Sequence, residues 1–599
     1  MALRGRLNSF LRVLIPAFAQ ALGLVLPLAR SSPLGATPGE GTIHAIYESR
    51  ETPRFESKLD SLVAARLNAL GIRPRLCSDA VFLRRVYLDL TGTVPTAAEA
   101  GAFLQNPNPN KRQALVDRLL DRPGFADYWS MRWGDVLRIK AEFPINLWPN
   151  AAQAYHRWVH DAVSTNKPYD QFVRALLCSS GSNFQVGEVN FYRAVQNRTP
   201  DGIAAAVALA FMGVRFETFS SGQRAGMIRC FSQIGYKPTG EWKEEHVFWD
   251  PLGASKLPDA IAPGRASLLT PSGQVPAREA NTLPKTLPSN APGKALMPDG
   301  TELLLPANRD PRELFADWLI RPENPWFARS FANRVWYWLL GRGIVQEPDD
   351  FRPDNPPSNP ALLDYLAGEF VASHYDVKHL CRLITTSTTY QLSSLSHSRS
   401  PEAEANFAAY PLRRLDAEVL IDAINKIAGT TDLYTSAIPE PFTYIPEDQS
   451  AISLADGSIT SPFLALFGRS ARATGMENER INTPVPAQWL HMLNSTHIQR
   501  KLEQGPALRQ LYNSSKKGRD LVELIYLTIL SRSPSAEEVA TFEAYGPKPP
   551  QGRPNPAADA DKSGKQIQTP NRPYSAKTNR EWLDLSWALI NSSEFLYRH

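Results

Sequence analysis

The sequence predicts a mainly α-helical protein with two multi-helical domains, which a proline-rich irregular connection joins. Apolar residues recur at helical spacing from Phe55 to about Phe231 and again from Asp310 onward. Ten prolines interrupt residues 250–308, so only short β-hairpins are expected there. A chain of 599 residues is also too long for one core. We therefore expect helical domains at 55–249 and 309–599.

The first 36 residues have the layout of a secretory signal peptide. Three arginines (Arg4, Arg6 and Arg12) precede an apolar stretch, and small residues follow it. A retained membrane anchor is the alternative, but the apolar stretch is short and two prolines break it. We expect a linker over residues 37–54, export to the periplasm or the cell surface, and no membrane span in the mature chain.

Local signals mark single helices in the N-terminal domain. Thr96 and Glu99 have the spacing of a capping box, in which side chain and backbone bond reciprocally at a helix start. Trp129, Trp133 and Leu137 recur at i, i+4 and i+8, which makes one apolar stripe. Core packing of this stripe is the expectation.

The C-terminal domain shows the same helical periodicity with one interruption. Helices are expected to begin near Asp310, Pro325, Pro360 and Val377. Residues 547–580 are rich in Pro, Lys, Asn and Ala and lack apolar periodicity. We interpret them as a disordered surface loop between two final helices.

The composition excludes some classes of protein. The formal net charge of +5 is small for this length, so we expect no nucleic-acid partner. The four cysteines are widely separated, without the close pairing that a zinc or haem site needs. Buried unpaired thiols are the expectation, and disulfides, which export would permit, are the alternative.

Long ordered motifs in both domains resemble a bacterial two-domain family. Residues 82–104, 115–138 and 167–177 resemble the second planctomycete cytochrome-associated domain, the PSCyt type. A second resemblance is to the planctomycete-specific PSD-type domain, and it covers residues 325–351, 357–370, 386–394, 410–424 and 490–495. The resemblance implies an exported protein of planctomycetes, verrucomicrobia or related bacteria. Such proteins are often joined to c-type cytochrome or carbohydrate-binding modules, and both domains are of unknown function.

Family members with haem carry Cys-x-x-Cys-His after the helix that here ends near Glu217. This chain has Thr-Phe-Ser-Ser-Gly-Gln-Arg over residues 218–224 instead. Covalent haem attachment needs two thiols and an adjacent histidine. We therefore predict no haem and no other cofactor.

A polar segment between two apolar runs is the best candidate binding site. It holds several arginines and glutamates with Gly468 and Gly475, and two arginines of another motif could join it in space. Clustered guanidinium groups suit a carboxylate or sulfate, but an ion-pair network that holds helices together is the alternative. With two loop aspartates, the candidate residues are Arg413, Arg414, Arg469, Arg472, Glu477, Glu479, Arg480, Asp349 and Asp350.

Two further patterns could form metal sites, but for each of them we prefer an interpretation without a metal. Asp349, Asp350 and Asp354 could offer oxygen ligands to calcium, but their spacing is irregular and loop capping fits better. His156 and His160 could bind zinc from one helical face, but no third ligand is evident. We interpret them as surface histidines and predict no metal.

The sequence contains no complete catalytic motif. A nucleophile elbow, a phosphate loop and a dinucleotide-binding glycine pattern are all missing. The leading hypothesis is an exported helical scaffold or binding protein that acts with an envelope protein or polysaccharide partner, in polysaccharide processing. One alternative is a hydrolase that acts on an anionic glycan through Glu477, Glu479, Asp349 and Asp350, with arginines as anion binders. The other is a haem-less docking protein for a cytochrome.

Overall fold

The computed structural model describes residues 46–142, 147–253, 255, 293–395, 397–398, 400–546 and 577–599. The predicted signal peptide, residues 256–292 of the proline-rich connection and most of the loop predicted at 547–580 lie outside this part of the chain. Residues 577–580 of that predicted loop are described, and the helix α26 (Asn579–Ile590) begins within them. No helix of the described residues is long and apolar enough to cross a membrane.

The first half of the chain is helical, as predicted, with one small sheet. The helices are α4 (Lys58–Ala69), α5 (Asp79–Thr91), α6 (Ala97–Gln105), α7 (Lys111–Leu120), α8 (Pro123–Val136), α9 (Pro149–Ser164), α10 (Tyr169–Cys178), α11 (Asn190–Ala194), α12 (Pro200–Val207) and α13 (Ser221–Cys230). The unexpected sheet is antiparallel with strand order β1-β3-β2 and contains β1 (Gly181–Ser182), β2 (Ile234–Pro238) and β3 (Glu245–Trp249). Ile234 pairs with Trp249 and Pro238 with Glu245.

A short hairpin forms at the end of the proline-rich connection. Strands β4 (Gly293–Leu296) and β5 (Glu302–Leu305) pair with Gly293 opposite Leu305. The hairpin lies on α13, where a Cβ atom at Gly226 would come within 2.0 Å of the Leu296 carbonyl oxygen. Only glycine permits this close approach. The expectation of short hairpins in a mainly α protein is confirmed.

The second half of the chain is almost entirely helical. Its helices are α14 (Pro311–Leu319), α15 (Phe327–Leu340), α16 (Pro360–Ala372), α17 (Val377–Thr385), α18 (Pro401–Ala405), α19 (Ala417–Ala428), α20 (Pro462–Leu466), α21 (Pro486–Asn494), α22 (Thr496–Gln504), α23 (Pro506–Tyr512), α24 (Arg519–Leu530), α25 (Ala536–Ala544), α26 (Asn579–Ile590) and α27 (Ser593–Leu596). A two-residue ladder joins β6 (Arg413–Arg414) to β7 (Tyr597–Arg598), with Arg413 opposite Arg598.

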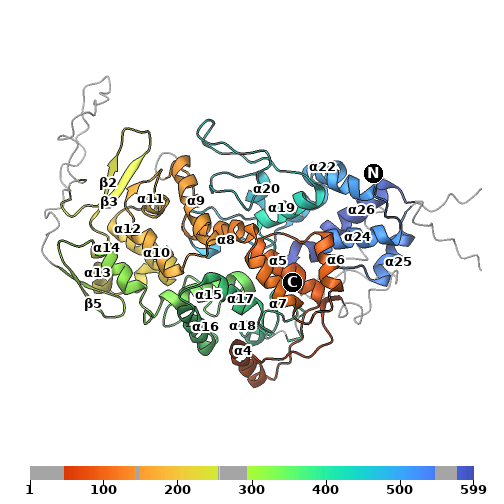
Figure 1. Ribbon diagram of the computed structural model, residues 1–599, viewed down its shortest axis with the longest axis horizontal. Coiled ribbons are helices and arrows are strands. Elements are labelled where there is room, and N and C mark those ends of the chain that lie inside the picture. The colour runs from red at the N-terminus through yellow and green to blue at the C-terminus, as the bar shows by residue number, and fades with distance from the viewer. Residues whose placement is uncertain are drawn as a thin grey trace, which may run out of the picture.

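Helices of the two halves are interleaved in space. At one end of the molecule α14 packs on α10 and α13, and at the other end α6 packs on α24 (Figure 1). Trp133 stacks on Phe331 with ring centroids 5.7 Å apart, and Trp129 meets Trp338 at 5.4 Å. Chain length predicts more than one core, but the described apolar residues form one continuous cluster across both halves. The aromatic stripe on α8 joins the two halves of the chain, because the rings of Trp129 and Trp133 pack against residues of α15.

Several local predictions are confirmed. Thr96 and Glu99 form the predicted capping box at α6. Trp129, Trp133 and Leu137 are buried. All four cysteines are free, and three of them are buried.

Candidate functional site: a buried arginine–carboxylate network

The candidate segment between α20 and α21 lies against α8. It is irregular apart from a single 3₁₀ turn at Glu477–Glu479. Gly468 and Gly475 have φ angles of 74° and 75°, a left-handed conformation that suits glycine. A Cβ atom at Gly475 would lie 2.7 Å from the Val136 carbonyl oxygen. Gly475 thus lets the segment approach α8 closely, whereas a Cβ atom at Gly468 would come within 2.0 Å of the Ile481 carbonyl oxygen in the same segment.

Asp135 on α8 binds two arginines of this segment. Arg472 Nε lies 3.0 Å from Asp135 Oδ1, and Arg480 Nη2 lies 2.7 Å from Asp135 Oδ2. Arg472 also donates to the carbonyl oxygens of Ile139 and Ala455, at 3.1 and 3.2 Å. Only 2% of Arg472 is exposed. Its guanidinium group is therefore fully occupied inside the protein.

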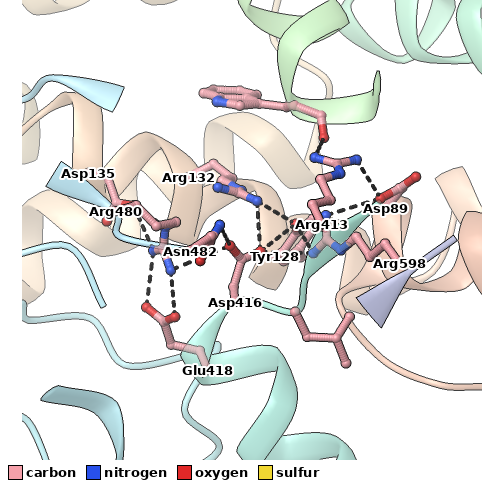
Figure 2. Close-up of polar contacts among 12 residues, drawn as sticks. Asp89, Tyr128, Arg132, Asp135, Arg413, Asp416, Glu418, Arg480, Asn482 and Arg598 are labelled. Carbon is pink, nitrogen blue, oxygen red and sulfur yellow. Dashed lines mark hydrogen bonds and ion pairs between the residues drawn. The ribbon is translucent and has the colours of Figure 1, made fainter. Parts of the chain in front are cut away.

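Glu418 on α19 binds the same segment from the other side. Arg480 donates to both of its carboxylate oxygens, at 2.6 and 3.1 Å (Figure 2). Arg469 Nε lies 3.3 Å from Glu418 Oε1. Burial would raise the pKa of the Glu418 carboxyl, but Arg480 and Arg469 hold it below its usual value. Arg480 thus bridges α8 and α19 through two ionised carboxylates.

Asp416 lies at the centre of the network. Its Oδ2 accepts from Arg132 and from Arg598, both at 2.8 Å, and its Oδ1 accepts from Asn482 at 3.1 Å (Figure 2). Burial opposes ionisation, but Arg132, Arg598 and Arg480 lower the pKa of Asp416 far below its usual value. Three segments distant in sequence therefore meet at one carboxylate.

Asp89 on α5 extends the network to the strand pair. Its Oδ1 lies 3.2 Å from Arg413 Nη2 and 3.1 Å from Arg598 Nη1, and its Oδ2 accepts from the hydroxyls of Tyr390 and Tyr410 at 2.7 and 2.9 Å. Arg598 consequently joins Asp89 to Asp416.

The remaining candidate residues have local structural contacts. Arg414 donates to the carbonyl oxygens of Phe467 and Ile481, at 2.7 and 3.0 Å, so it does join the candidate segment in space. Glu479 accepts from the backbone N–H groups of Ala473 and Thr474, at 3.1 and 2.6 Å. These contacts fix the backbone of the segment.

Glu477 and Asp349 form a neighbouring buried pair. The indole N–H of Trp338 donates to Glu477 Oε1 at 2.8 Å, and the Glu477 backbone N–H donates to Asp349 Oδ2 at 2.7 Å. Arg334 binds Asp349 at 2.6 Å. Burial raises the pKa of Glu477 to about 7, against the opposing effect of Arg132.

The loop aspartates do not gather around one point. Asp349 points inward to Arg334, whereas Asp350 and Asp354 pair with Arg352 at 3.2 and 3.4 Å. Within the described ranges, no group of three or more His, Cys, Asp or Glu side chains is placed to hold a metal ion.

The interpretation of both α9 histidines as surface residues is wrong for His156. Its side chain is buried, because it lies on the inner face of α9, and burial lowers its pKa to about 3. His160 remains partly exposed and contacts Asp127 at 3.2 Å.

Replacing Glu477 by Gln should change the pH dependence of stability. Gln keeps an oxygen for the Trp338 N–H and removes the ionisable group. Between the pKa of a free Glu, about 4.3, and the raised value, the native state binds the extra proton. Wild-type stability therefore falls as pH rises through this window. We expect the variant to be more stable than the wild type by about 1 kcal/mol at pH 5, and by less than about 4 kcal/mol at pH 8.

Urea unfolding at pH 5, 6.5 and 8 checks this expectation. Glu404→Gln is the control, because Glu404 is an exposed residue paired with Arg342. A Glu477→Gln difference that stays constant across the three pH values would contradict the expectation.

Comparison with known families identifies both halves of the chain. Residues 58–220 match PSCyt2, a protein of unknown function (DUF1549), and residues 311–545 match PSD1, a protein of unknown function (DUF1553). The chain belongs to the two-domain PSCyt2–PSD1 family. No curated protein and no solved structure compared with it matches. The network therefore joins the PSCyt2 region, through Asp89, Arg132 and Asp135, to the PSD1 region, through Arg413, Asp416, Glu418 and Arg480.

Residues 218–224, for which the sequence predicts no haem attachment, contain the start of α13. The side-chain oxygen of Ser220 accepts from the Gln223 N–H, and the Gln223 side chain accepts from the Ser220 N–H at 3.0 Å. Gln223 also donates to the Pro298 carbonyl oxygen at 2.7 Å. These residues cap α13 and hold the β4–β5 hairpin.

The sequence predicted four arginines of the network, Arg413, Arg469, Arg472 and Arg480. It did not predict the other two, Arg132 and Arg598, or the carboxylates Asp89, Asp135, Asp416 and Glu418. One sequence signal exists for Asp89, because apolar residues flank it on both sides, with Leu88 before it and Leu90 after it.

Proposed function

We propose that this protein is an exported scaffold or binding protein that acts with a partner at the cell envelope. Polysaccharide processing is the proposed setting, because the family resemblance implies proteins that are often joined to carbohydrate-binding modules. The buried network supports a non-catalytic role for the predicted arginines, since each is engaged by protein groups.

Exposed apolar side chains in the PSD1 region are the observation that carries the proposal. Ile481, Val485, Leu490 and Leu493 are exposed within one stretch of the chain, and Leu490 is 60% exposed. Leu493 also lines a surface hollow of about 410 Å³ with Leu583 and Trp587. Contiguous exposed apolar surface marks interaction sites, and the exposure of four apolar residues within one short stretch supports such a site here. We name Ile481, Val485, Leu490 and Leu493 the α21 surface.

Charge substitutions on the α21 surface should release the partner. We expect Leu490→Glu with Leu493→Glu to reduce recovery of the principal captured protein at least tenfold, because burial of a carboxylate in an apolar interface is costly. The measurement is quantitative mass spectrometry after pull-down from the native cell envelope. Circular dichroism checks that the double variant and its control variant are folded.

Leu304→Glu is the matched control. Leu304 is 68% exposed but lies on β5, away from α21. Recovery that is equal for wild type, control and double variant would contradict the proposal. A cytochrome as the captured protein would support the haem-less docking form of this proposal.

The hydrolase alternative is less well supported. Two catalytic carboxyl groups must face substrate across a cleft. Asp349 and Glu477 have side chains that are 7% exposed and are bound to Arg334 and Trp338. Recovery of a glycan without a protein partner, followed by its cleavage on incubation, would favour this alternative.

A further inference from the structure

Two histidines of the PSD1 region face each other across a tight helix junction. His491 lies on α21 and His497 on α22, and only Ser495 separates the two helices. Ser495 caps α22 by accepting a hydrogen bond from the Ile498 N–H at 3.3 Å. The junction turns the chain sharply, so the two imidazoles meet although their spacing in sequence is not helical.

The distance between the facing nitrogens suits a shared metal ion. His491 Nε2 and His497 Nδ1 are 3.4 Å apart. Ordinary hydrogen bonds from N–H donors are about 2.7–3.2 Å long. Two nitrogens bound tetrahedrally to one ion at about 2.0–2.1 Å lie about 3.4 Å apart. The observed separation therefore matches two ligands of one coordination shell better than a hydrogen bond.

A carboxylate orients the second histidine. His497 Nε2 lies 3.2 Å from Asp432 Oδ1. A proton on Nε2 leaves the lone pair of Nδ1 directed toward His491. Histidines that bind metals usually donate their other N–H to a carboxylate in this way.

The surroundings include a carboxylate oxygen that is free to accept, and they admit solvent. Asp432 Oδ2 is buried and, among the described residues, accepts no hydrogen bond. Lys501 is the nearest cation to this carboxylate, with its Nζ 3.9 Å from Oδ1. The His497 side chain is 30% exposed, so water can reach the pair. The ring of Phe463 lies 5.7 Å from His491 and 5.9 Å from His497, and closes one side.

We propose that His491 and His497 bind a divalent transition metal such as Cu²⁺ or Zn²⁺, with Asp432 as the positioning carboxylate. Imidazole nitrogens suit these ions. The protein supplies two ligands, and water completes the shell. The site is separate from the buried network and lies beside the α21 surface, because His491 directly follows Leu490 on α21.

Calorimetric titration of the tag-free protein with Cu²⁺ and with Zn²⁺ tests the site. We expect one ion per chain and tighter binding of Cu²⁺ than of Zn²⁺. His491→Ala and His497→Ala should each abolish measurable binding. Asp432→Asn should weaken it by about 10–100-fold, the usual effect of losing such a carboxylate.

The α9 histidines provide the matched control. His156 and His160 have ring centroids 6.3 Å apart, but His156 is buried and His160 contacts Asp127. Replacing both by Ala should leave the titration unchanged. The proposal is overturned if the folded wild type binds neither ion, if His491→Ala and His497→Ala still bind, or if binding disappears with the α9 pair instead.

Discussion

Replacing Asp416 by Asn should lower the free energy of unfolding by about 3–5 kcal/mol, the usual cost of breaking a buried ion pair on one side. Asp416 neutralises Arg132 and Arg598, each 2.8 Å away, and all three side chains are buried. Asn would remove the nearest counter-charge of Arg132 and leave Arg598 with Asp89 as its only close carboxylate among the described residues. Chemical unfolding at pH 7, followed by circular dichroism, measures the loss.

The pH dependence of this effect has a definite sign. Folding lowers the pKa of Asp416, so its contribution is complete above the ordinary pKa of a free aspartate. The contribution is lost as the pH falls through the lower folded-state value. The difference between wild type and variant should therefore be largest at neutral pH and shrink in acid.

A surface ion pair provides the control for this substitution. Asp364 pairs with Arg329, and both side chains are more than 40% exposed. Asp364→Asn should cost less than about 1 kcal/mol. Equal small losses for Asp416→Asn and Asp364→Asn would show that the network contributes little to stability.

Replacing Arg598 by Met should destabilise the protein by a similar amount, about 3–5 kcal/mol. Arg598 lies between Asp89 and Asp416, at 3.1 and 2.8 Å, and only 1% of it is exposed. Met fills much of the volume but leaves two carboxylates facing each other with less positive charge between them. Thermal unfolding should show a lower transition temperature for the variant than for the wild type.

Arg329→Met is the control on the surface, because it removes the other half of the exposed pair with Asp364. Its transition temperature should stay close to that of the wild type. An Arg598→Met variant as stable as this control would mean that Arg413 alone satisfies Asp89 and that Arg598 is dispensable.

Much of the fold follows from local patterns in the sequence. The 3.6-residue periodicity predicts most helices, and the capping boxes at Thr96 and Ser535 mark two of their starts. The three-stranded sheet was missed because β1 has two residues and its pairing with β3 spans a long separation in sequence. The shared core was missed for a related reason, since no local signal shows that Trp133 packs on Phe331.

The candidate site was predicted only in part. Guanidinium groups stand out in a polar loop, so Arg472 and Arg480 were found. Their partners Asp135 and Glu418 lie on helices with continuous apolar faces, where a single charge looks like ordinary helix surface. His491 and His497 face each other because the chain turns at Ser495. Their spacing in the sequence does not correspond to one face of a helix, so the sequence gives no sign of this contact.

The central claim is that the network makes the PSCyt2 and PSD1 regions one structural unit. Hydrogen exchange of Asp416→Asn, measured by mass spectrometry under native conditions, tests it most directly. We predict that α10 in the PSCyt2 region and α19 in the PSD1 region lose protection together, because the two regions open as one unit. Loss of protection confined to α19 and its neighbours, with α10 as protected as in the wild type, would contradict the claim.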